Sequence, residues 1–346
     1  MKHQTTRYGE IPFYKIGTFG NTADAFISKK LFLEYKTKYS FPKKGDILIS
    51  ASGTIGRAVI YDGKPAYFQD SNIVWIDNDE TLVKNDFLFY AYSNVKWNTE
   101  YTTILRLYND NFRNTLIPLP PLNEQIAIAN ILSGLDRYLC ALDALILKKE
   151  SVKKSLSFEL LSQRKRLKGF NQAWQRVRLG DIANYLTSNL SAEQITQQGK
   201  IKVYDVNNFI GYTDTTFISD KPYISIVKDG SVGRVRILPP KTNILSTMGA
   251  LIANHRTTTE FLFYLLSNFD FKNFTSGSII PHIYFKDYKE KTIFLPPLNE
   301  QSAIANILSD LDNEIASLKN KKRQFENIKK ALNHDLMSAK IRVLKK

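Results

Sequence analysis

Residues 119–136 read LPPLNEQIAIANILSGLD, and residues 295–312 read LPPLNEQSAIANILSDLD. Sixteen of these 18 positions are identical, at an offset of 176 residues. An exact-period match of this kind indicates an internal repeat. Weaker matches precede each copy of this segment, in the same order. GTIGR at 53–57 matches GSVGR at 230–234, and FLFY at 87–90 matches FLFY at 261–264. The sequence therefore predicts two copies of one module, each an irregular domain followed by a helix.

The repeated segment has the features of a helix start. Pro120 and Pro121 cannot lie inside a helix, and Asn123 is expected to cap it, with Glu124 in a first turn where negative charge suits the helix dipole. If Asn123–Leu167 is continuous, the helix is about 68 Å long at about 1.5 Å per residue.

Apolar residues recur along both helices at alternating spacings of four and three, which is typical of a coiled-coil seam. A helix with one such stripe needs a partner, and the other copy supplies it. The step from Phe325 to Ile328 breaks the strict heptad. Cys140 is expected to pack on the apolar side. The predicted seam is Ile128, Leu132, Leu135, Leu139, Leu142 and Ile146 in the first helix, and Ile304, Leu308, Leu311, Ile315, Leu318, Lys322, Phe325, Ile328 and Leu332 in the second.

Residues 1–121 and 171–297 hold short β-prone runs separated by Gly, Asn, Asp and Lys turns. One short helix is expected at 85–94 and its counterpart at 259–268. The predicted fold class is α+β, with two domains in tandem and two long helices packed as an antiparallel coiled coil, related by a pseudo-twofold repeat. The predicted boundaries are 1–121 for the first domain, 122–170 for its helix, 171–297 for the second domain and 298–346 for its helix.

The two domains differ at their starts. GEIPFY at 9–14 aligns with GKIKVY at 199–204, and nothing before Gly9 corresponds to 174–198. We therefore expect the first domain to lack the opening strand and helix of the second.

Composition restricts the functional class. The 346 residues carry 48 Lys and Arg against 33 Asp and Glu, a formal charge of +15, which favours a polyanionic partner and nucleic acid above all. The surplus is three or four charges in each of the four predicted segments, which indicates a long basic surface rather than a basic tail. A single cysteine, a polar start and no apolar run of about 20 residues predict a cytoplasmic protein without disulfides.

Catalytic motifs are not found. The sequence has no GxxxxGK[ST] loop for nucleotide phosphates, no glycine-rich turn for S-adenosylmethionine, and no Asn or Asp before Pro-Pro and an aromatic residue. Four scattered histidines and one cysteine offer no metal-site spacing. We expect no catalytic residues, no metal and no cofactor in this chain.

An LPPLxEQ segment that opens a long helix, occurs twice and separates two dissimilar domains resembles the specificity subunit of Type I restriction–modification enzymes. The opening of the second domain, Trp174 followed by VRLGDI at 177–182, also resembles that family. The resemblance implies that each irregular domain reads one half of a bipartite, asymmetric site in double-stranded DNA. It implies that the helices space the domains and dock two methyltransferase subunits, through which restriction subunits join. S-adenosylmethionine, ATP and Mg²⁺ are then expected only on the partners.

The candidate DNA contacts lie at the two matching Gly-x-x-Gly turns, where small residues let backbone amides approach phosphates. Arg57 and Arg234 follow these turns, and an arginine there can pair bidentately with guanine. The alternative is a plain hairpin with a solvent-facing arginine. A second candidate loop is 277–284, in which Tyr284 matches Tyr108 and is equally compatible with a core position. The predicted DNA-binding residues are Ser52, Thr54, Arg57, Gln69, Asn72, Lys228, Ser231, Arg234, His282, Tyr284 and Lys286, with Asp70 as a further candidate.

Helix lysines such as Lys153 are expected to contact DNA phosphates or the methyltransferase. Half-site centres are expected about one helical turn apart. Two other classes stay open: a stand-alone DNA-binding scaffold, and a nuclease or methyltransferase with an unrecognised active site.

Overall fold

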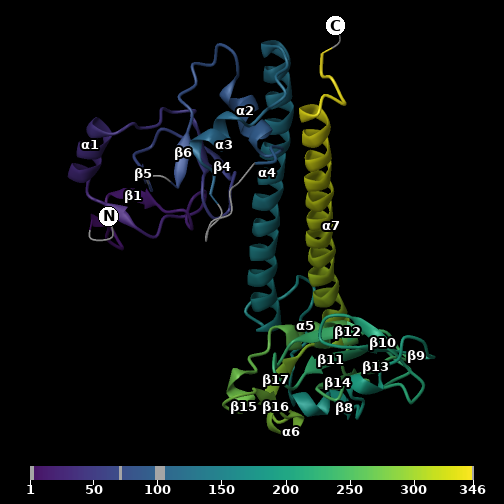
Figure 1. Ribbon diagram of the computed structural model, residues 1–346. Coiled ribbons are helices and arrows are strands. Elements are labelled where there is room, and N and C mark those ends of the chain that lie inside the picture. Colours follow the sequence, from purple (N-terminus) through teal and green to yellow (C-terminus); the bar gives the residue numbers. More distant parts are fainter. Residues whose placement is uncertain (1–3, 70–71, 98–105, 345–346) are drawn as a thin grey trace. The chain divides into compact units, whose positions relative to one another are not determined.

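The structure, a computed structural model, describes residues 4–69, 72–97 and 106–344 (Figure 1). It divides into two compact units: unit 1 comprises Met1–Asp143 and Asn320–Lys346, and unit 2 comprises Ala144–Lys319. Two long helices, α4 (Leu122–Leu161) and α7 (Leu298–Met337), pass from one unit into the other. The two compact units therefore differ from the predicted segments. Each unit contains one domain together with parts of both long helices, because each domain packs against both of them.

Unit 1 has two small sheets. In the first, with strand order β2-β1-β5, β1 pairs antiparallel with β2 and parallel with β5; in the second, with order β4-β3-β6, all pairs are antiparallel. The strands are β1 (Ile11–Tyr14), β2 (Phe26–Ile27), β3 (Ile47–Ser50), β4 (Ala58–Ile60), β5 (Tyr67–Phe68) and β6 (Ile73–Trp75), and the short helices are α1 (Lys29–Lys38), α2 (Asn85–Tyr92) and α3 (Asn109–Arg113).

Unit 2 repeats both sheets and extends them. The order β10-β9-β13 matches β2-β1-β5, and β12-β11-β14-β8 matches β4-β3-β6 with one strand added. Two strand pairs, β17-β7 and β15-β16, complete the unit. The strands are β7 (Gln175–Arg178), β8 (Ala183–Thr187), β9 (Ile201–Tyr204), β10 (Phe209–Thr213), β11 (Tyr223–Val227), β12 (Val235–Leu238), β13 (Asn243–Ile244), β14 (Met248–Ala253), β15 (Thr275–Ser276), β16 (His282–Ile283) and β17 (Thr292–Leu295). The helices are α5 (Thr259–Ser267) and α6 (Phe285–Tyr288), with 3₁₀ turns η2 (Leu179–Asp181), η3 (Ala192–Gln194) and η4 (Lys272–Phe274).

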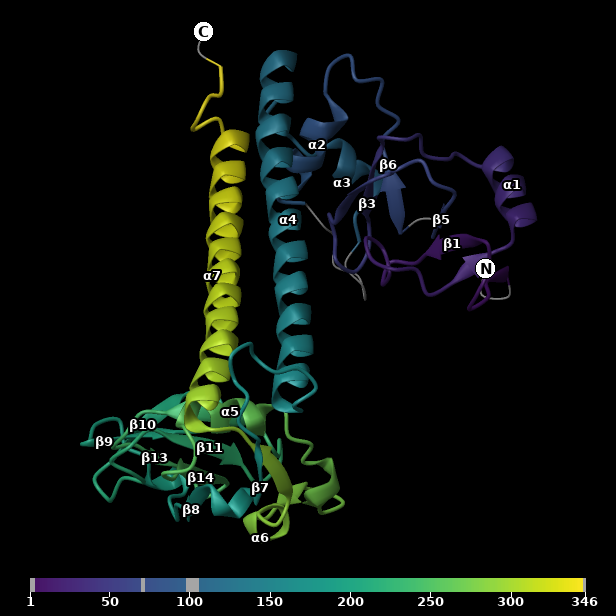
Figure 2. The same ribbon diagram turned by 180° about the vertical axis from the view of Figure 1, so that it is seen from behind.

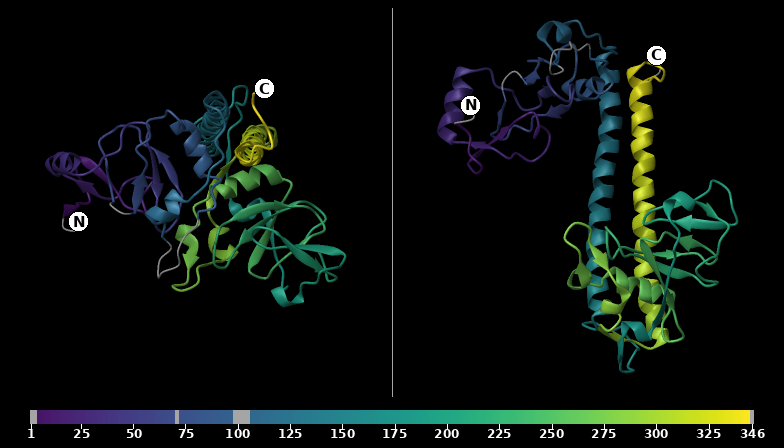
Figure 3. Two further views of the ribbon diagram at one scale, coloured as in Figure 1. Left: turned by 45° about the horizontal axis from the view of Figure 1, so that its top comes forward. Right: turned by 60° about the horizontal axis from the view of Figure 1, so that its bottom comes forward.

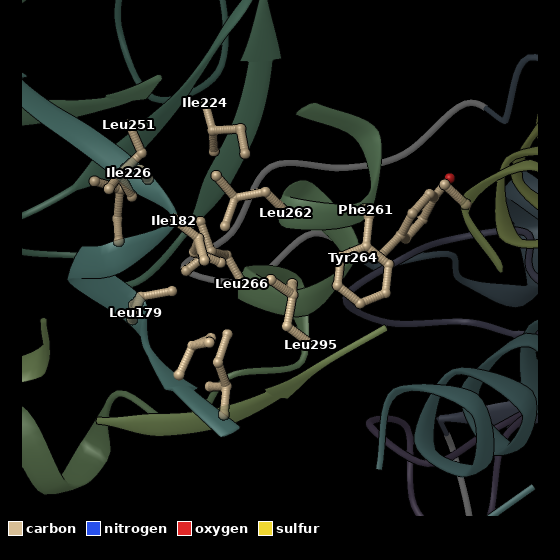
Figure 4. Close-up of a cluster of buried hydrophobic side chains, with 14 of the residues drawn as sticks. Leu179, Ile182, Ile224, Ile226, Leu251, Phe261, Leu262, Tyr264, Leu266 and Leu295 are labelled. Atoms are coloured by element: carbon tan, nitrogen blue, oxygen red, sulfur yellow. The ribbon is translucent and has the colours of Figure 1, made fainter. Parts of the chain in front are cut away.

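A short helix joins the sheet to the long helices in each unit. In unit 2, Leu262 and Leu266 of α5 point toward Ile224 of β11 and Ile182, which directly precedes β8, while Tyr264 lies on another side of α5 (Figure 4). In unit 1, Figure 2 shows α2 beside α4, where Phe87 packs in one cluster with residues of both long helices. Burial of apolar side chains on both faces thus fixes each domain to the helices.

The helix pair is antiparallel within each unit. In unit 2, Lys149 lies 2.8 Å from Glu314, and Lys153, further along α4, pairs with Asp312, which lies earlier on α7. In unit 1, Asp136 pairs with Lys329 and Asp143 lies 2.7 Å from Lys322, again in opposite order, and the halves of α4 and α7 run side by side in the views of Figure 3.

Both long helices end earlier than the sequence predicts, and α4 begins at Leu122, before the predicted cap. Pro121 precedes the first turn and its carbonyl accepts from Glu124 N and Gln125 N, so Asn123 lies inside the helix and is not its cap. At the other end, α4 stops at Leu161 because Gln163 adopts a left-handed conformation (φ 61°) that ends a helix. The 40 residues of α4 span about 60 Å, not 68 Å.

The predicted seam is wrong at Ile328, which is 50% exposed. Lys329 takes the inward position, so that Lys322, Phe325, Lys329 and Leu332 continue the alternation of three and four without a break. Cys140 is also exposed rather than packed. Within the part of the chain that the structure describes, no helix is long and apolar enough to cross a membrane.

Candidate nucleic-acid interface

The two Gly-x-x-Gly segments form equivalent hairpin turns, β3 to β4 in unit 1 and β11 to β12 in unit 2. The second glycine of each has positive φ, 82° at Gly56 and 79° at Gly233. A Cβ at Gly56 would lie 2.2 Å from the Trp97 indole, and one at Gly233 would lie 2.6 Å from the Phe271 ring. Glycine is therefore required twice over at each turn, by backbone conformation and by the aromatic side chain behind it.

Arg57 and Arg234 occupy matching positions after these turns but have different partners. Arg57 Nη1 donates to the carbonyl of Phe19 at 2.9 Å, and Arg234 Nη2 donates to Asn207 Oδ1 at 2.7 Å. Both side chains lie at the surface. The hydrogen bond to the Phe19 carbonyl holds one guanidinium nitrogen of Arg57 in place. The hydrogen bond of Arg234 instead joins two side chains, and the Asn207 amide can contact a ligand as well.

In unit 2, the turn and the predicted 277–284 loop lie together. Gly230 N donates to the Pro281 carbonyl and Ile283 N to the Lys228 carbonyl, each at 2.9 Å. His282 Nδ1 lies 2.6 Å from Asp229 Oδ1. Backbone and side-chain contacts thus place Lys228, Ser231, Arg234 and His282 on one continuous surface.

Aromatic and apolar side chains extend this surface. The Tyr284 ring is exposed, lies 6.4 Å from the His282 ring, and has the Lys286 ammonium 5.5 Å above it. Ile279 at the tip of the loop is 92% exposed. Exposed rings and cations in one place are suited to bases and phosphates, and exposed apolar tips to base steps or methyl groups. Tyr284 is not a core residue, and neither is its counterpart Tyr108, which is also exposed.

A Tyr–Asp–Lys arrangement anchors each domain to the helices. Tyr90 Oη donates to Asp136 at 2.7 Å, and Asp136 pairs with Lys329. The unit 2 counterparts are Tyr264, which donates to Asp312 at 2.9 Å, and Lys153, which pairs with Asp312. Burial, and then the neighbouring carboxylate, raise the pKa of both phenols.

The Lys153 ammonium is thus committed to the helix pair and lies 5.7 Å above the Tyr264 ring. This pairing favours a structural role for Lys153, and the predicted contact with DNA phosphates stays a prediction.

Glu and Gln of the repeated LPPLNEQ segments form a second anchor. Arg342 Nη2 donates to Glu124 Oε2 at 2.6 Å, and Arg166 Nη2 donates to Glu300 Oε2 at 2.6 Å. The hydrogen bonds from Arg342 lower the pKa of Glu124. In unit 2, the indole Nε1 of Trp174 also donates to Glu300 Oε2, at 3.0 Å.

Gln125 and Gln301, the glutamines of the two LPPLNEQ segments, make equivalent contacts. Gln125 Oε1 accepts from Lys84 N at 2.8 Å, and Gln301 Oε1 accepts from Thr258 N at 3.0 Å. Each ties the start of a long helix to the start of the short helix beside it. This shared role accounts for the same residues occurring in both copies.

The sequence matches the family described as the Type I restriction modification DNA specificity domain over residues 1–150 and 171–327. These two matches cover both domains and most of both long helices. The chain belongs to this family.

Individual relatives of this specificity family agree. A putative type I restriction enzyme specificity subunit of Haemophilus influenzae is 65% identical over 133 residues, which are 38% of this chain and 34% of that protein. The putative MjaX specificity subunit of Methanocaldococcus jannaschii is 27% identical over 335 residues, covering 86% of this chain and 79% of that one. The crystal structure of a Type I restriction–modification S subunit from M. genitalium has the same fold, with a TM-score of 0.63 and 20% identity over 97% of this chain and 91% of that chain.

The predicted DNA-binding residues of the first domain are less accessible at the surface than those of the second domain. Ser52 is buried and donates to Asn72 Oδ1 at 2.8 Å, and Gln69 Oε1 accepts from Ile16 N at 3.3 Å. Ser52 is therefore not a surface residue, because it closes the loop from inside. Thr54 is exposed, and Asp70 lies outside the described residues.

The sequence analysis did not identify Asn207 and Arg236 of unit 2 as candidate site residues. Asn207 accepts from Arg234 through its side chain and from Arg236 Nη1 through its carbonyl, at 2.8 Å for the latter. The Arg236 guanidinium lies 5.2 Å from the Tyr204 ring. The alternation of Arg234, directly before β12, and Arg236 on β12 was visible in the sequence, but the loop that meets them was not. Among the described residues, no group of three or more His, Cys, Asp or Glu side chains could hold a metal ion.

Proposed function

We propose that this chain is the non-catalytic subunit through which a Type I restriction–modification complex reads a bipartite, asymmetric site in double-stranded DNA. Each domain reads one half-site. The long helices, as an antiparallel coiled coil, set the spacing and dock two methyltransferase subunits, which carry S-adenosylmethionine. Restriction subunits with ATP and Mg²⁺ join through the methyltransferases.

The observation that carries this proposal is the duplication itself. The family match covers both copies, and both domains are anchored to the helices by the same Tyr–Asp–Lys and Glu–Arg contacts. The two reading surfaces nevertheless differ in sequence, so two similar platforms present different side chains. Different half-sites are the expected consequence.

The unit 2 surface supplies the means of reading DNA. Lys228, Arg234 and Lys286 give cations for phosphates, while Arg234, Asn207 and His282 offer donors or acceptors for base edges. The surplus of 15 positive charges over the whole chain supports binding to the phosphate backbone.

The test is to co-express the chain with a candidate methyltransferase subunit of a Type I system and to map methylated bases in the host DNA. We expect one split, asymmetric motif that disappears when this chain is omitted, and no methyl transfer by the chain alone. Sequence-specific DNA binding without co-purification of a methyltransferase would instead indicate a stand-alone scaffold. Methylation or cleavage by the purified chain would indicate an enzyme.

A further inference from the structure

The turn between β9 and β10, residues 205–208, carries an asparagine that is exposed and yet held at three points. Asn207 Oδ1 accepts from Arg234 Nη2 at 2.7 Å, and the Asn207 carbonyl accepts from Arg236 Nη1 at 2.8 Å. The backbone N of Asn207 donates to Asp205 Oδ1 at 2.8 Å. Asn207 nevertheless lies at the surface of unit 2. Its side chain is therefore fixed in position without being covered.

The contact with Arg234 decides which way the Asn207 amide faces. A guanidinium group has only N–H donors, so the amide atom that meets it must be the oxygen. The Nδ2 group of Asn207 has no acceptor among the residues that the structure describes. The oxygen keeps a second lone pair for a further donor. The exposed amide therefore offers one donor and one acceptor side by side.

Arg236 is itself held by both sheets of unit 2. It lies on β12 and pairs with Ser225 of β11 in the ladder. Its guanidinium lies 5.2 Å from the ring of Tyr204 on β9, which belongs to the other sheet. The contact with Asn207 thus ties the β9–β10 turn to the edge of the second sheet. A side chain supported in this way is preorganised for recognition.

Unit 1 lacks this arrangement. The corresponding loop, between β1 and β2, meets Arg57 at the main-chain carbonyl of Phe19. Val59 stands two residues after Arg57, where unit 2 has Arg236 two residues after Arg234. The loop of unit 1 therefore fixes its arginine through the main chain, whereas the loop of unit 2 does so through a side chain. The held asparagine is a feature of the second domain.

We propose that Asn207 reads an adenine in the half-site of the second domain, a role that rests on the DNA-reading function proposed above. In the major groove, Nδ2 donates to adenine N7 while Oδ1 accepts from the N6 amino group. Guanine presents acceptors at both places, so the Asn207 oxygen would face another oxygen. Arg236 acts as a positioning residue for this amide. The other N–H groups of Arg234 stay available to a neighbouring base or phosphate.

The experiment incubates the full chain with DNA duplexes that contain a randomised region and sequences the bound fraction. We expect the parent chain to enrich a split motif. Asn207→Ala should reduce the preference for one adenine in one half of it by about 10- to 100-fold, as expected for the loss of a bidentate pair. Asn207→Asp keeps the shape but offers only acceptors, so it should shift the preference at this position to cytosine, whose N4 amino group is a donor.

Asn208 provides the matched control. It is the exposed neighbour in the same turn, and among the described residues it bonds only through its main chain. Asn208→Ala and Asn208→Asp should enrich the parent motif unchanged. Thermal unfolding checks that every variant is folded.

The positioning role of Arg236 has its own measurement. Arg236→Gln should weaken the preference for the same adenine as Asn207→Ala does. Added to Asn207→Ala, it should weaken that preference no further, because both changes remove one interaction. Additive losses would show that Arg236 does not act through Asn207.

Two results would overturn the role of Asn207 and leave DNA reading by this chain intact. One is enrichment of the parent motif by Asn207→Ala, and the other is an equal effect of the changes at Asn207 and Asn208, which would indicate a general effect of the turn or its charge. If the parent chain enriches no sequence at all, the proposed function itself fails, and the adenine contact fails with it.

Discussion

At the residue scale, a position's partners decide its role more than its type does. Lys153 and Lys329 lie at seam positions, where an apolar residue is the usual choice, and each is paired with an aspartate that also accepts from a tyrosine. A half-buried charge of this kind is tolerated because its hydrogen-bonding capacity is satisfied. These pairs therefore link the two helices, and we expect neither lysine to contact DNA.

Lys153→Ala should lower the free energy of unfolding by about 1 kcal/mol, since a hydrogen-bonded but part-exposed ion pair is lost. The salt dependence of DNA binding should stay the same, because no phosphate contact is removed. Lys148→Ala, at an exposed position of the same helix, is the control for stability. A salt slope that falls by about one unit in Lys153→Ala would show that the lysine contacts phosphate.

Arg57→Ala and Arg234→Ala should each relax specificity at one half-site only, by about 1–3 kcal/mol if the arginine pairs with guanine. Binding to DNA with one half-site scrambled at a time separates the two effects. Uniform weakening on every sequence would mean that both turns hold phosphates, and that His282–Lys286 carries the reading in unit 2.

The Glu124–Arg342 pair should make stability depend on pH at the acidic end. The folded-state pKa of Glu124 is lowered, so the pair stabilises the fold above the ordinary glutamate pKa of about 4.3 and loses this contribution as the pH falls through the lowered value. Urea unfolding at several pH values should show Arg342→Gln less stable than the parent at pH 7 and nearly equal to it at about pH 2–3. A difference that stays constant over this range would contradict the assignment.

At the element scale, each long helix combines an apolar seam with anchors for a domain. The sequence pattern located the seam but misplaced one position, because the apolar Ile328 was preferred over the neighbouring Lys329, which keeps the period. Packing decides otherwise, since Asp136 and Tyr90 supply partners for the ammonium.

Leu308→Asp and Ile328→Asp test this placement with the same chemical change. Leu308 is fully buried, so an unpaired carboxylate there should cost several kcal/mol and disrupt helix pairing and methyltransferase docking together. Ile328 is half exposed, and aspartate there should change stability by less than about 1 kcal/mol. Circular dichroism melting and co-purification measure the two effects. Equal losses in both variants would restore Ile328 to the seam.

At the scale of the whole molecule, two domains with matching sheets and matching anchors carry different surface residues at the candidate DNA-binding turns. Replacing the second domain, residues 175–295, by that of another family member should change one half of the methylated sequence and leave the other half unchanged. The repeated LPPLNEQ segments remain in place as anchors. Methylation mapping measures the outcome, with replacement of the first domain as the reciprocal control. A change in both halves at once would mean that the domains do not read independently.

The sequence by itself determined the duplication, the two long helices and the two Gly-x-x-Gly turns, because these depend on local identity, periodicity and backbone conformation. Only the tertiary structure decided that Lys153 pairs with Asp312, that Ser52 is buried, that Asn207 meets Arg234, and that Glu124 binds Arg342. Each of these depends on segments far apart in the chain, from 20 residues for Ser52 and Asn72 to 218 for Glu124 and Arg342. Sequence periodicity carries no information on such pairs, because their distance is set by how the sheets and helices pack.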